Sequence, residues 1–132
     1  MGRLRYLLDT HTLLWVVRDS DRLSSDARKA LDDSTAQYFI SAVSAYEIMY
    51  KHNLGKLSGF EDIAENYINV INELGAIELP ITMQHAHYAG QVKWSHRDPF
   101  DRLLAAQAHI ENMTLLTNDP DIKSLSWVTT LW

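Results

Sequence analysis

Short apolar runs alternate with helical stretches along almost the whole chain, and this alternation limits the possible folds more than any other feature. The first run ends at Leu8 and leads into an apolar helix, and the same order recurs towards the C-terminal end. We predict strands at about 4–8, 37–40, 76–79, 114–117 and 127–129. We predict helices at about 12–17, 24–31, 61–74, 82–92 and 99–110, and a further helix that contains Glu47 and ends near 53–55. Such alternation is typical of an α/β fold with a mostly parallel sheet covered on both faces.

The composition limits the size and the environment of this fold. With 132 residues, of which 46% are hydrophobic, the chain can form one core but not two ordinary domains, so we expect a single domain over 1–132. No apolar stretch reaches the roughly 20 residues that cross a bilayer, and no signal-peptide region follows the first arginines. We therefore expect a cytoplasmic protein without membrane contact. The sequence has no cysteine, so any metal must be held by oxygen or imidazole ligands.

Acidic residues recur where one predicted element gives way to the next. Four of them stand out: Asp9, Glu47, Asp101 and Asp119. Residues at the carboxyl ends of parallel strands tend to meet in one crevice. Four carboxylates that meet there repel one another unless a divalent cation neutralises them, and hard cations prefer oxygen ligands. The sequence therefore predicts a site for Mg²⁺ or Mn²⁺.

The first two acids also have local structural explanations. Asp9 suits an N-cap of the helix that follows it. Glu47 fits a capping box with Ser44, or an ion pair with Lys51 one helical turn later. Helix capping accounts for each acid singly, but it does not explain why so many acids fall at one predicted edge of the sheet.

The C-terminal acids belong to two Asp-Pro junctions. Asp98 reads as the N-cap of a helix that begins with a proline and carries Asp101 in its first turn. Asp119 follows the last long apolar run and is a candidate cap for a short helix that begins at Pro120. Asp121 competes with Asp119 for the role of fourth ligand.

The charge balance narrows the ways in which this chain could bind nucleic acid. A net charge of −5, from 17 acidic and 12 basic side chains, argues against a broad basic surface. A few basic residues beside the acids could still hold phosphates, and a tryptophan there could stack on a base. The candidates are Lys93, Trp94, His96, Arg97 and Arg102. The histidines lack a metal-binding spacing, and we expect them, including His85 and His87, at the surface.

Four motifs follow one another along the chain: LLDTHTLLW, SAVSAYEI, DPFDRLLAAQA and LLTNDPDI. In order and approximate spacing they resemble the PIN-domain ribonucleases, and within these the VapC-like toxins of prokaryotic type II toxin-antitoxin modules. The resemblance covers nearly the whole chain. It implies a three-layer α/β/α fold around a mostly parallel sheet of four to five strands.

The resemblance also implies a site and partners. In that family, acids corresponding to Asp9, Glu47, Asp101 and Asp119 gather around Mg²⁺ or Mn²⁺, and an acid corresponding to Asp98 is a common companion. The family resemblance further implies an RNA substrate, a homodimer, and inhibition by a small cognate antitoxin protein.

These observations lead to a mechanistic expectation. We expect a metal-dependent endoribonuclease in which Asp9, Asp101 and Asp119 coordinate the cation. Glu47 completes the shell or orients the attacking water, and the cation lowers the pKa of that water and neutralises charge on phosphorus. The five basic and aromatic candidates above are the expected RNA contacts.

Supporting residues and alternatives complete the prediction. Thr10 and Thr117 are candidates to hydrogen-bond a carboxylate or a phosphate. A haloacid-dehalogenase-like phosphotransferase is disfavoured because His11 stands where its second aspartate is expected. The remaining alternative is a catalytically silent PIN fold that only binds a partner or RNA.

Overall fold

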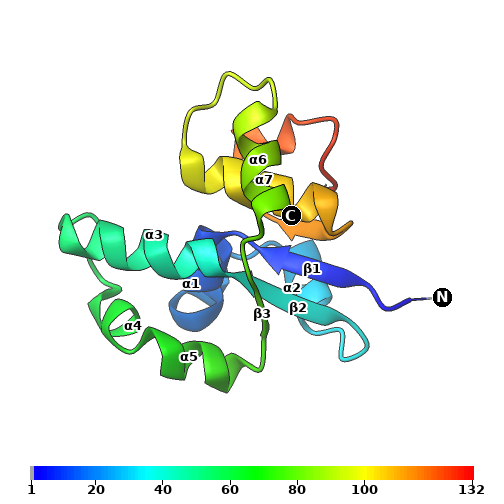
Figure 1. Cartoon of the computed structure of the whole chain (residues 1–132). Helices are drawn as coiled ribbons and strands as arrows, with labels where there is room; N and C mark the ends of the chain where they lie inside the picture. The colour runs from blue at the N-terminus through cyan, green and yellow to red at the C-terminus, as the bar shows by residue number, and fades with distance from the viewer. Residues whose placement is uncertain (1) are drawn as a thin grey trace.

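A computed structural model describes residues 2–132, which form one five-stranded sheet with helices on both faces (Figure 1). The strands are β1 (Arg5–Leu8), β2 (Gln37–Ser41), β3 (Ile77–Leu79), β4 (Thr114–Leu116) and β5 (Thr130–Leu131). The helices are α1 (Thr10–Arg18), the 3-10 helix η1 (Ser20–Arg22), α2 (Ser25–Leu31), α3 (Ala42–Asn53), α4 (Glu61–Glu65), α5 (Tyr67–Leu74), α6 (Met83–Gln91), α7 (Pro99–Ile110) and α8 (Pro120–Lys123).

All four strand pairings in the described chain are parallel, and the strand order is β3-β2-β1-β4-β5. The central strand β1 pairs on one side with β2, where Leu8 lies opposite Ile40, and on the other with β4, where Leu8 lies opposite Leu116. Parallel neighbours require a crossover, and helices supply each one. The predicted α/β/α fold is confirmed, with a sheet that is parallel throughout.

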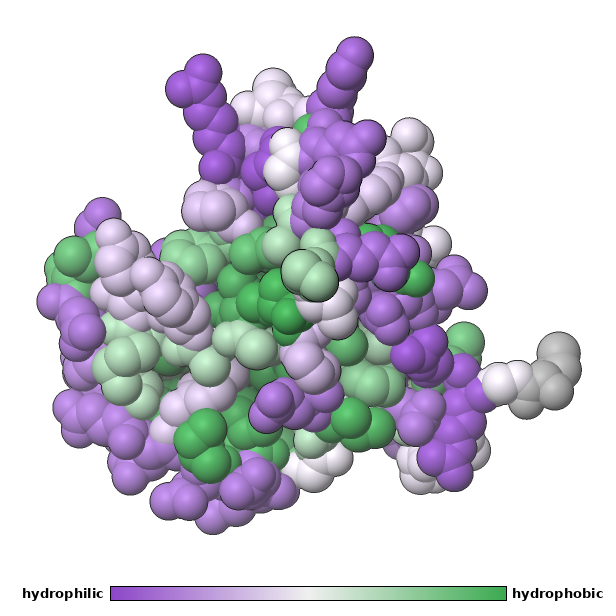
Figure 2. Space-filling model, in the orientation of Figure 1, coloured by the Kyte–Doolittle hydropathy of each residue, from purple (hydrophilic) through white to green (hydrophobic). Residues whose placement is uncertain are grey.

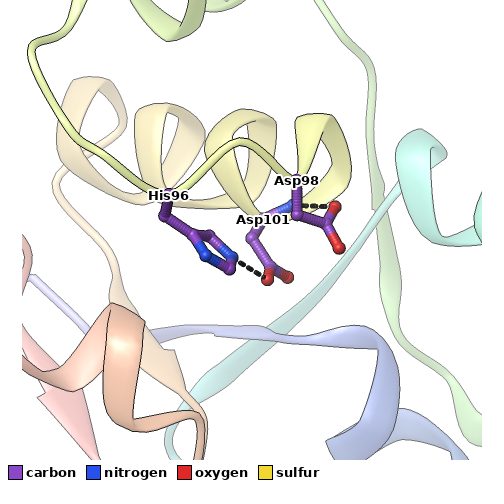
Figure 3. Close-up of side chains that lie close together, drawn as sticks. All are labelled: His96, Asp98 and Asp101. Carbon is purple, nitrogen blue, oxygen red and sulfur yellow. Dashed lines mark hydrogen bonds and ion pairs between the residues drawn. The ribbon is translucent and has the colours of Figure 1, made fainter.

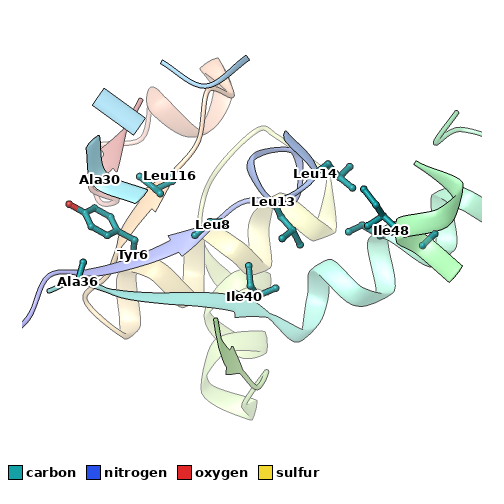
Figure 4. Packing of buried hydrophobic residues seen from close by; sticks show 11 residues of the cluster. Tyr6, Leu8, Leu13, Leu14, Ala30, Ala36, Ile40, Ile48 and Leu116 are labelled. Atoms are coloured by element: carbon teal, nitrogen blue, oxygen red, sulfur yellow. The ribbon is translucent and has the colours of Figure 1, made fainter. Parts of the chain in front are cut away.

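The side chains of β1 alternate between two apolar cores, as the period of a strand requires. Tyr6 and Leu8 pack with α1, α2, α4 and the half-buried side chains of α5, and Figure 4 shows part of this cluster. Leu7 points to the opposite face, where it packs with Leu104 of α7 and Ile122 of α8. The central strands are therefore covered on both sides, which explains their nearly continuous apolar sequence.

Two predicted elements differ from the structure. The helix predicted over 61–74 is two helices, α4 and α5, because the chain breaks at Asn66. The Asp62 carbonyl accepts from both the backbone amide and the side-chain amide of Asn66 at 3.0 Å, a local side-chain bond of the kind that disturbs a regular helix. The last strand is Thr130–Leu131 instead of 127–129, because the Trp127 carbonyl is bonded by His109 Nδ1 at 2.8 Å.

The prediction that the histidines lie at the surface is wrong for His85, which is 1% exposed. Its Nδ1 accepts from the Thr82 amide at 3.0 Å, and the Thr82 hydroxyl accepts from the His85 amide, so the pair caps α6. Its Nε2 lies 3.2 Å from the Glu111 carboxylate. His87 is exposed, as expected.

The outer surface carries one further feature that concerns the site. On the face shown in Figure 2, apolar residues gather at the centre and polar residues surround them. An apolar cavity of about 640 Å³ lies between α3 and the start of α7, and Tyr46, Tyr50 and Phe100 contribute to its lining. No helix in the described part of the chain is long and apolar enough to span a membrane.

Two leucines that lie close together in the sequence test this packing. Leu7 is completely buried between β2 and β4, whereas Leu4 is 58% exposed. We expect Leu7→Ala to lower the free energy of unfolding by about 3 kcal/mol, the usual cost of a buried leucine truncation. Leu4→Ala should change it by less than about 0.5 kcal/mol. Urea denaturation of both variants measures the difference, and equal effects would contradict the assigned register.

Candidate metal centre

The predicted acids lie at the carboxyl edge of the sheet or on helices that begin beside it. Asp9 directly follows β1, and Asp119 lies three residues after β4. Glu47 lies on α3, which begins at the end of β2, and Asp101 lies in the first turn of α7. Because β1, β2 and β4 are adjacent and parallel, their carboxyl ends open on the same side.

Asp9 is buried and held by both of its oxygens. The residue is 5% exposed. Its Oδ1 accepts from the Thr12 amide at 2.7 Å, and this bond caps α1. Its Oδ2 accepts from the Thr117 hydroxyl, and the same hydroxyl accepts from the Asp119 amide at 3.0 Å. Thr117 therefore links Asp9 to Asp119. Both acids line a cavity of about 270 Å³, together with His11.

Burial has an electrostatic consequence for Asp9. Loss of solvent raises the pKa of its carboxyl group above the ordinary value, and the bonds from Thr117 and Thr12 oppose this rise. The hydrogen bonds thus favour the charged form in a place where the protein interior disfavours it. Such an arrangement suits a group whose charge is needed at that position.

Glu47 is 2% exposed, and one of its oxygens has no protein partner. Lys51 Nζ donates to Oε2, which confirms the ion pair one turn later. Within residues 2–132, no hydrogen-bond donor reaches Oε1. A buried, unbonded carboxylate oxygen costs free energy, so it indicates that a further group belongs there.

The capping-box explanation of Glu47 is wrong. Helix α3 is capped by Ser41, whose Oγ accepts from the Val43 amide at 3.0 Å. Ser44 is instead buried, with its hydroxyl 3.0 Å from the hydroxyl of Thr10. Helix capping therefore does not account for Glu47.

Asp101 lies between two further groups on the same stretch of chain, His96 and Asp98 (Figure 3). His96 Nε2 is 2.7 Å from Asp101 Oδ2. Asp98 caps α7, because its Oδ1 accepts from the amides of Phe100 and Asp101 at 2.9 and 3.3 Å. Each of these three side chains can offer one ligand atom within 4.8 Å of the others.

The pKa of Asp101 reflects its burial and the acids around it. It is raised to about 6, chiefly by burial and against the effect of the His96 hydrogen bond. The charges of Asp98, Asp119 and Glu47 raise it further. The Asp101 carboxyl group is therefore affected by its neighbour Asp98 and by acids from two other elements, Glu47 of α3 and Asp119 at the start of α8.

The structure separates the two candidates for the fourth acid. Asp119 caps α8 through Oδ1, which accepts from the amides of Asp121 and Ile122 at 2.8 and 3.4 Å. It shares a cavity with Asp9. Asp121 is exposed and its Oδ2 lies 3.5 Å from His96 Nδ1. Geometry thus favours Asp119 as the neighbour of Asp9.

The five candidates for RNA contact lie in and beside the loop that precedes α7. Lys93 and Arg97 are exposed, and Trp94 is half-buried against the core of this face. The Arg102 guanidinium donates to four backbone carbonyls of that region: those of Ala89, Val92, Trp94 and His96. Arg102 therefore fixes the loop, and its contact with RNA stays a prediction, as do the contacts of the other four.

Sequence reasoning did not find three parts of this centre. These are the bond from His96 to Asp101, the buried contact between Ser44 and Thr10, and the loop-fixing role of Arg102. The short spacing of His96, Asp98 and Asp101 before a helix was the only available signal. The other two contacts join residues far apart in the sequence and carry no local pattern.

The arrangement fits a hard divalent cation. The group whose ligand atoms lie within 4.8 Å of one another is His96, Asp98 and Asp101, and its carboxylate oxygens are donors that Mg²⁺ and Mn²⁺ prefer. Two observations support a bound cation here: the unpaired Glu47 Oε1 and the raised pKa of Asp101. A bound cation would give Glu47 Oε1 a partner, and its positive charge would lower the pKa of Asp101.

Comparison with known proteins adds independent information. The sequence profile of the PIN domain matches residues 6–128. Among solved structures, VapBC2 from Rickettsia felis bound to a promoter DNA fragment superposes with a TM-score of 0.70 at 17% identity, covering 97% of this chain and 98% of that one. DNA-bound VapBC from Salmonella typhimurium gives 0.70 at 20% identity, with 97% of both chains covered. VapBC-1 from nontypeable Haemophilus influenzae gives 0.69 at 17% identity, again with 97% of both covered. The curated proteins contain no match.

The raised pKa of Asp101 leads to a stability prediction. The folded state holds the Asp101 proton more tightly than an unfolded chain, since the pKa rises from 3.8 to about 6. Without metal, stability should therefore fall as the pH rises from about 4 to about 6 and remain lower above that range. Asp101→Asn cannot ionise, so in EDTA at pH 7.5 it should melt about 3 °C above the wild type, as roughly 1 kcal/mol would produce.

Thermal unfolding in EDTA at a series of pH values measures this difference. The gain of Asp101→Asn should shrink below about pH 6 and vanish near about pH 3, where the wild-type carboxyl group is protonated in both the folded and the unfolded state. A variant that is less stable than the wild type at pH 7.5 would show that Asp101 stabilises the metal-free fold.

Proposed function

The chain belongs to the PIN domain family, and from this premise we propose that it is a metal-dependent endoribonuclease that hydrolyses RNA phosphodiester bonds. The observation that carries the proposal is the buried convergence of acids around Asp101, with the free Oε1 of Glu47 beside them. Helix capping accounts for one oxygen each of Asp9, Asp98 and Asp119, but it does not explain why the buried Glu47 and the half-buried Asp101 lie near them. Hydrolysis assisted by a divalent cation would explain this arrangement.

Asp9, Asp101 and Asp119 would hold Mg²⁺ or Mn²⁺, and Glu47 would complete the shell or orient the attacking water. When bound, such a cation lowers the pKa of a water ligand and stabilises negative charge on the phosphate.

The protein's own side chains prepare this site. Thr117 fixes Asp9 Oδ2 and the Asp119 amide together, so one hydroxyl sets the relative position of two proposed ligands. Lys51 holds Glu47 Oε2, which leaves Oε1 as the free oxygen. Such outer contacts orient ligands and are worth about 10- to 100-fold in metal affinity.

RNA would approach from the side of the exposed basic loop. Lys93 and Arg97 extend from the segment that precedes α7 and could hold phosphates beside the acids. The chain as a whole carries a net charge of −5, so affinity for RNA depends on these few cations and on the bound metal. An unpaired, flexible strand is the form of RNA that can reach such a centre.

We further propose that the chain is the toxin of a type II toxin-antitoxin module, acting in the cytoplasm as a homodimer with a small cognate antitoxin. The support is the PIN domain itself together with the similarity to the VapBC structures. A basic segment of an inhibitor would suit this acidic centre, because its positive charges would neutralise the carboxylates as a bound cation would. The apolar cavity beside Tyr46 and Phe100 offers surface for such protein contacts.

The proposed activity can be tested with purified, partner-free protein. Total cellular RNA should yield discrete fragments with Mn²⁺ and none with EDTA. Asp9→Asn should lower cleavage by at least about 100-fold, the scale of losing one group that stabilises charge in the transition state. Asp26→Asn removes an exposed acid from α2 and is the matched control, with wild-type cleavage expected.

Two results of that assay would count against the proposal. Full metal-dependent cleavage by Asp9→Asn would indicate a contaminating nuclease or a different site. Folded protein that neither binds Mn²⁺ nor cleaves RNA would favour the catalytically silent PIN fold, which binds a partner or RNA only.

The role as a toxin gives a prediction in cells. Induced expression of the wild-type chain alone should arrest bacterial growth, because RNA cleavage stops translation, whereas Asp9→Asn expressed to the same level should not. Colony counts after induction, with immunoblots for protein level, measure the effect. Equal growth arrest by the wild type and by Asp9→Asn would mean that the toxicity does not depend on Asp9.

A further inference from the structure

His96 contacts acids that belong to two different helices. Its Nε2 lies 2.7 Å from Asp101 Oδ2 on α7, and its Nδ1 lies 3.5 Å from Asp121 Oδ2 on α8. The two helices are separated along the chain by the whole of β4. The imidazole ring therefore adds a polar contact between two helices that otherwise meet through the apolar core, to which Leu104 and Ile122 both belong.

The ring is fixed in this position by its own surroundings. The His96 carbonyl accepts from Arg102 Nη1 at 3.0 Å, and the Trp94 ring packs against the imidazole with centroids 4.9 Å apart. With both nitrogens facing carboxylates, the ring has no further hydrogen-bonding atom to offer a phosphate. His96 is thus better placed to act on its neighbouring acids than on RNA.

The Asp121 end of this bridge leads directly to Asp119. Helix α8 has only four residues, and the Asp121 amide donates to Asp119 Oδ1 at 2.8 Å. A shift of Asp121 would therefore carry Asp119 with it. The negative charges of Asp119 and Asp101 repel each other, and the contacts that oppose this repulsion are the buried Ile122 of α8 and the approach of Asp121 to His96.

We propose that His96 is a positioning residue that ties α8 to Asp101 and so holds Asp119 and Asp101 at the separation that a shared divalent cation needs. The inference rests on the proposed metal site, but not on the identity of the substrate. His96 acts here through the two carboxylates, without touching the reacting atoms.

A double-mutant cycle with Mn²⁺ as the probe tests the bridge. The variants are His96→Ala, Asp121→Ala and the double variant, with His87→Ala as the control because His87 is an exposed histidine on α6. Each single variant at the bridge should weaken Mn²⁺ binding by about tenfold, the scale of losing an outer contact to a ligand. The double variant should bind no more weakly than either single one, because both remove the same bridge.

A second readout needs neither metal nor activity. Amide hydrogen exchange in EDTA reports the opening of α8, whose amides at 123 and 124 donate to Asp119 and Pro120 carbonyls. These amides should exchange faster in both single variants than in the wild type or His87→Ala. Circular dichroism would confirm that the four chains are folded.

Several results would overturn the inference. Additive losses of Mn²⁺ affinity, or unchanged exchange of α8, would mean that no bridge operates. A ¹⁴N coupling in pulsed EPR of bound Mn²⁺ that disappears in His96→Ala would make His96 a direct ligand. A rise in KM for RNA with unchanged Mn²⁺ binding would make it a substrate contact.

The same experiment separates this inference from the proposed function. If the wild-type chain binds Mn²⁺ and the cycle is non-additive but no RNA is cleaved, the ribonuclease proposal fails and the bridge stands. If the wild-type chain binds no Mn²⁺, the bridge has no metal site to serve and the inference fails with the proposed centre.

Discussion

The parallel pairing of β1 with both β2 and β4 is the constraint on which the rest of this structure depends. It places the carboxyl ends of three strands side by side at one edge of the sheet. An acid that follows any of these strands therefore lies near the acids that follow the others. The apolar faces of β1 then fix the register, because Leu7 and Leu8 must enter opposite cores. A slip of one residue would bury the wrong side chains and also displace Asp9. The stability of the sheet and the geometry of the acids are therefore specified by the same residues.

Helix capping is compatible with the proposed metal binding by the same carboxylate. Asp9, Asp98 and Asp119 each cap a helix through Oδ1. The cap orients the side chain at low entropic cost, since the backbone amides it bonds are fixed by the helix. The second oxygen of each group is then aimed by a rigid element. A capping role therefore does not exclude the proposed metal-binding role of these three acids, whereas Glu47 has no capping role at all.

The parts of the molecule that could be predicted are those coded by local patterns. Strand and helix alternation gave the α/β class, and the Asp-Pro junctions gave the caps of α7 and α8, because these signals lie within a few residues. The break at Asn66, the late start of β5 and the burial of His85 depend on hydrogen bonds with partners that short patterns do not specify. The bridge from His96 to Asp121 spans 25 positions, so no spacing rule reveals it. The four proposed ligands were chosen from their positions in the sequence, whereas the contacts that join them in the structure carry no local pattern.

The ion pair between Lys51 and Glu47 bears on whether the chain can fold before it binds metal. Together with His96 beside Asp101, it supplies cationic groups from within the chain to an otherwise repulsive cluster. Lys51 and His96 therefore offset part of the negative charge before any metal binds, in contrast to small zinc domains, which fold only when their metal binds. We expect the newly synthesised chain to reach its final shape in a cell poor in free divalent cations. Loading with metal would then be a late and reversible event, which a cell could govern through ion supply separately from protein synthesis.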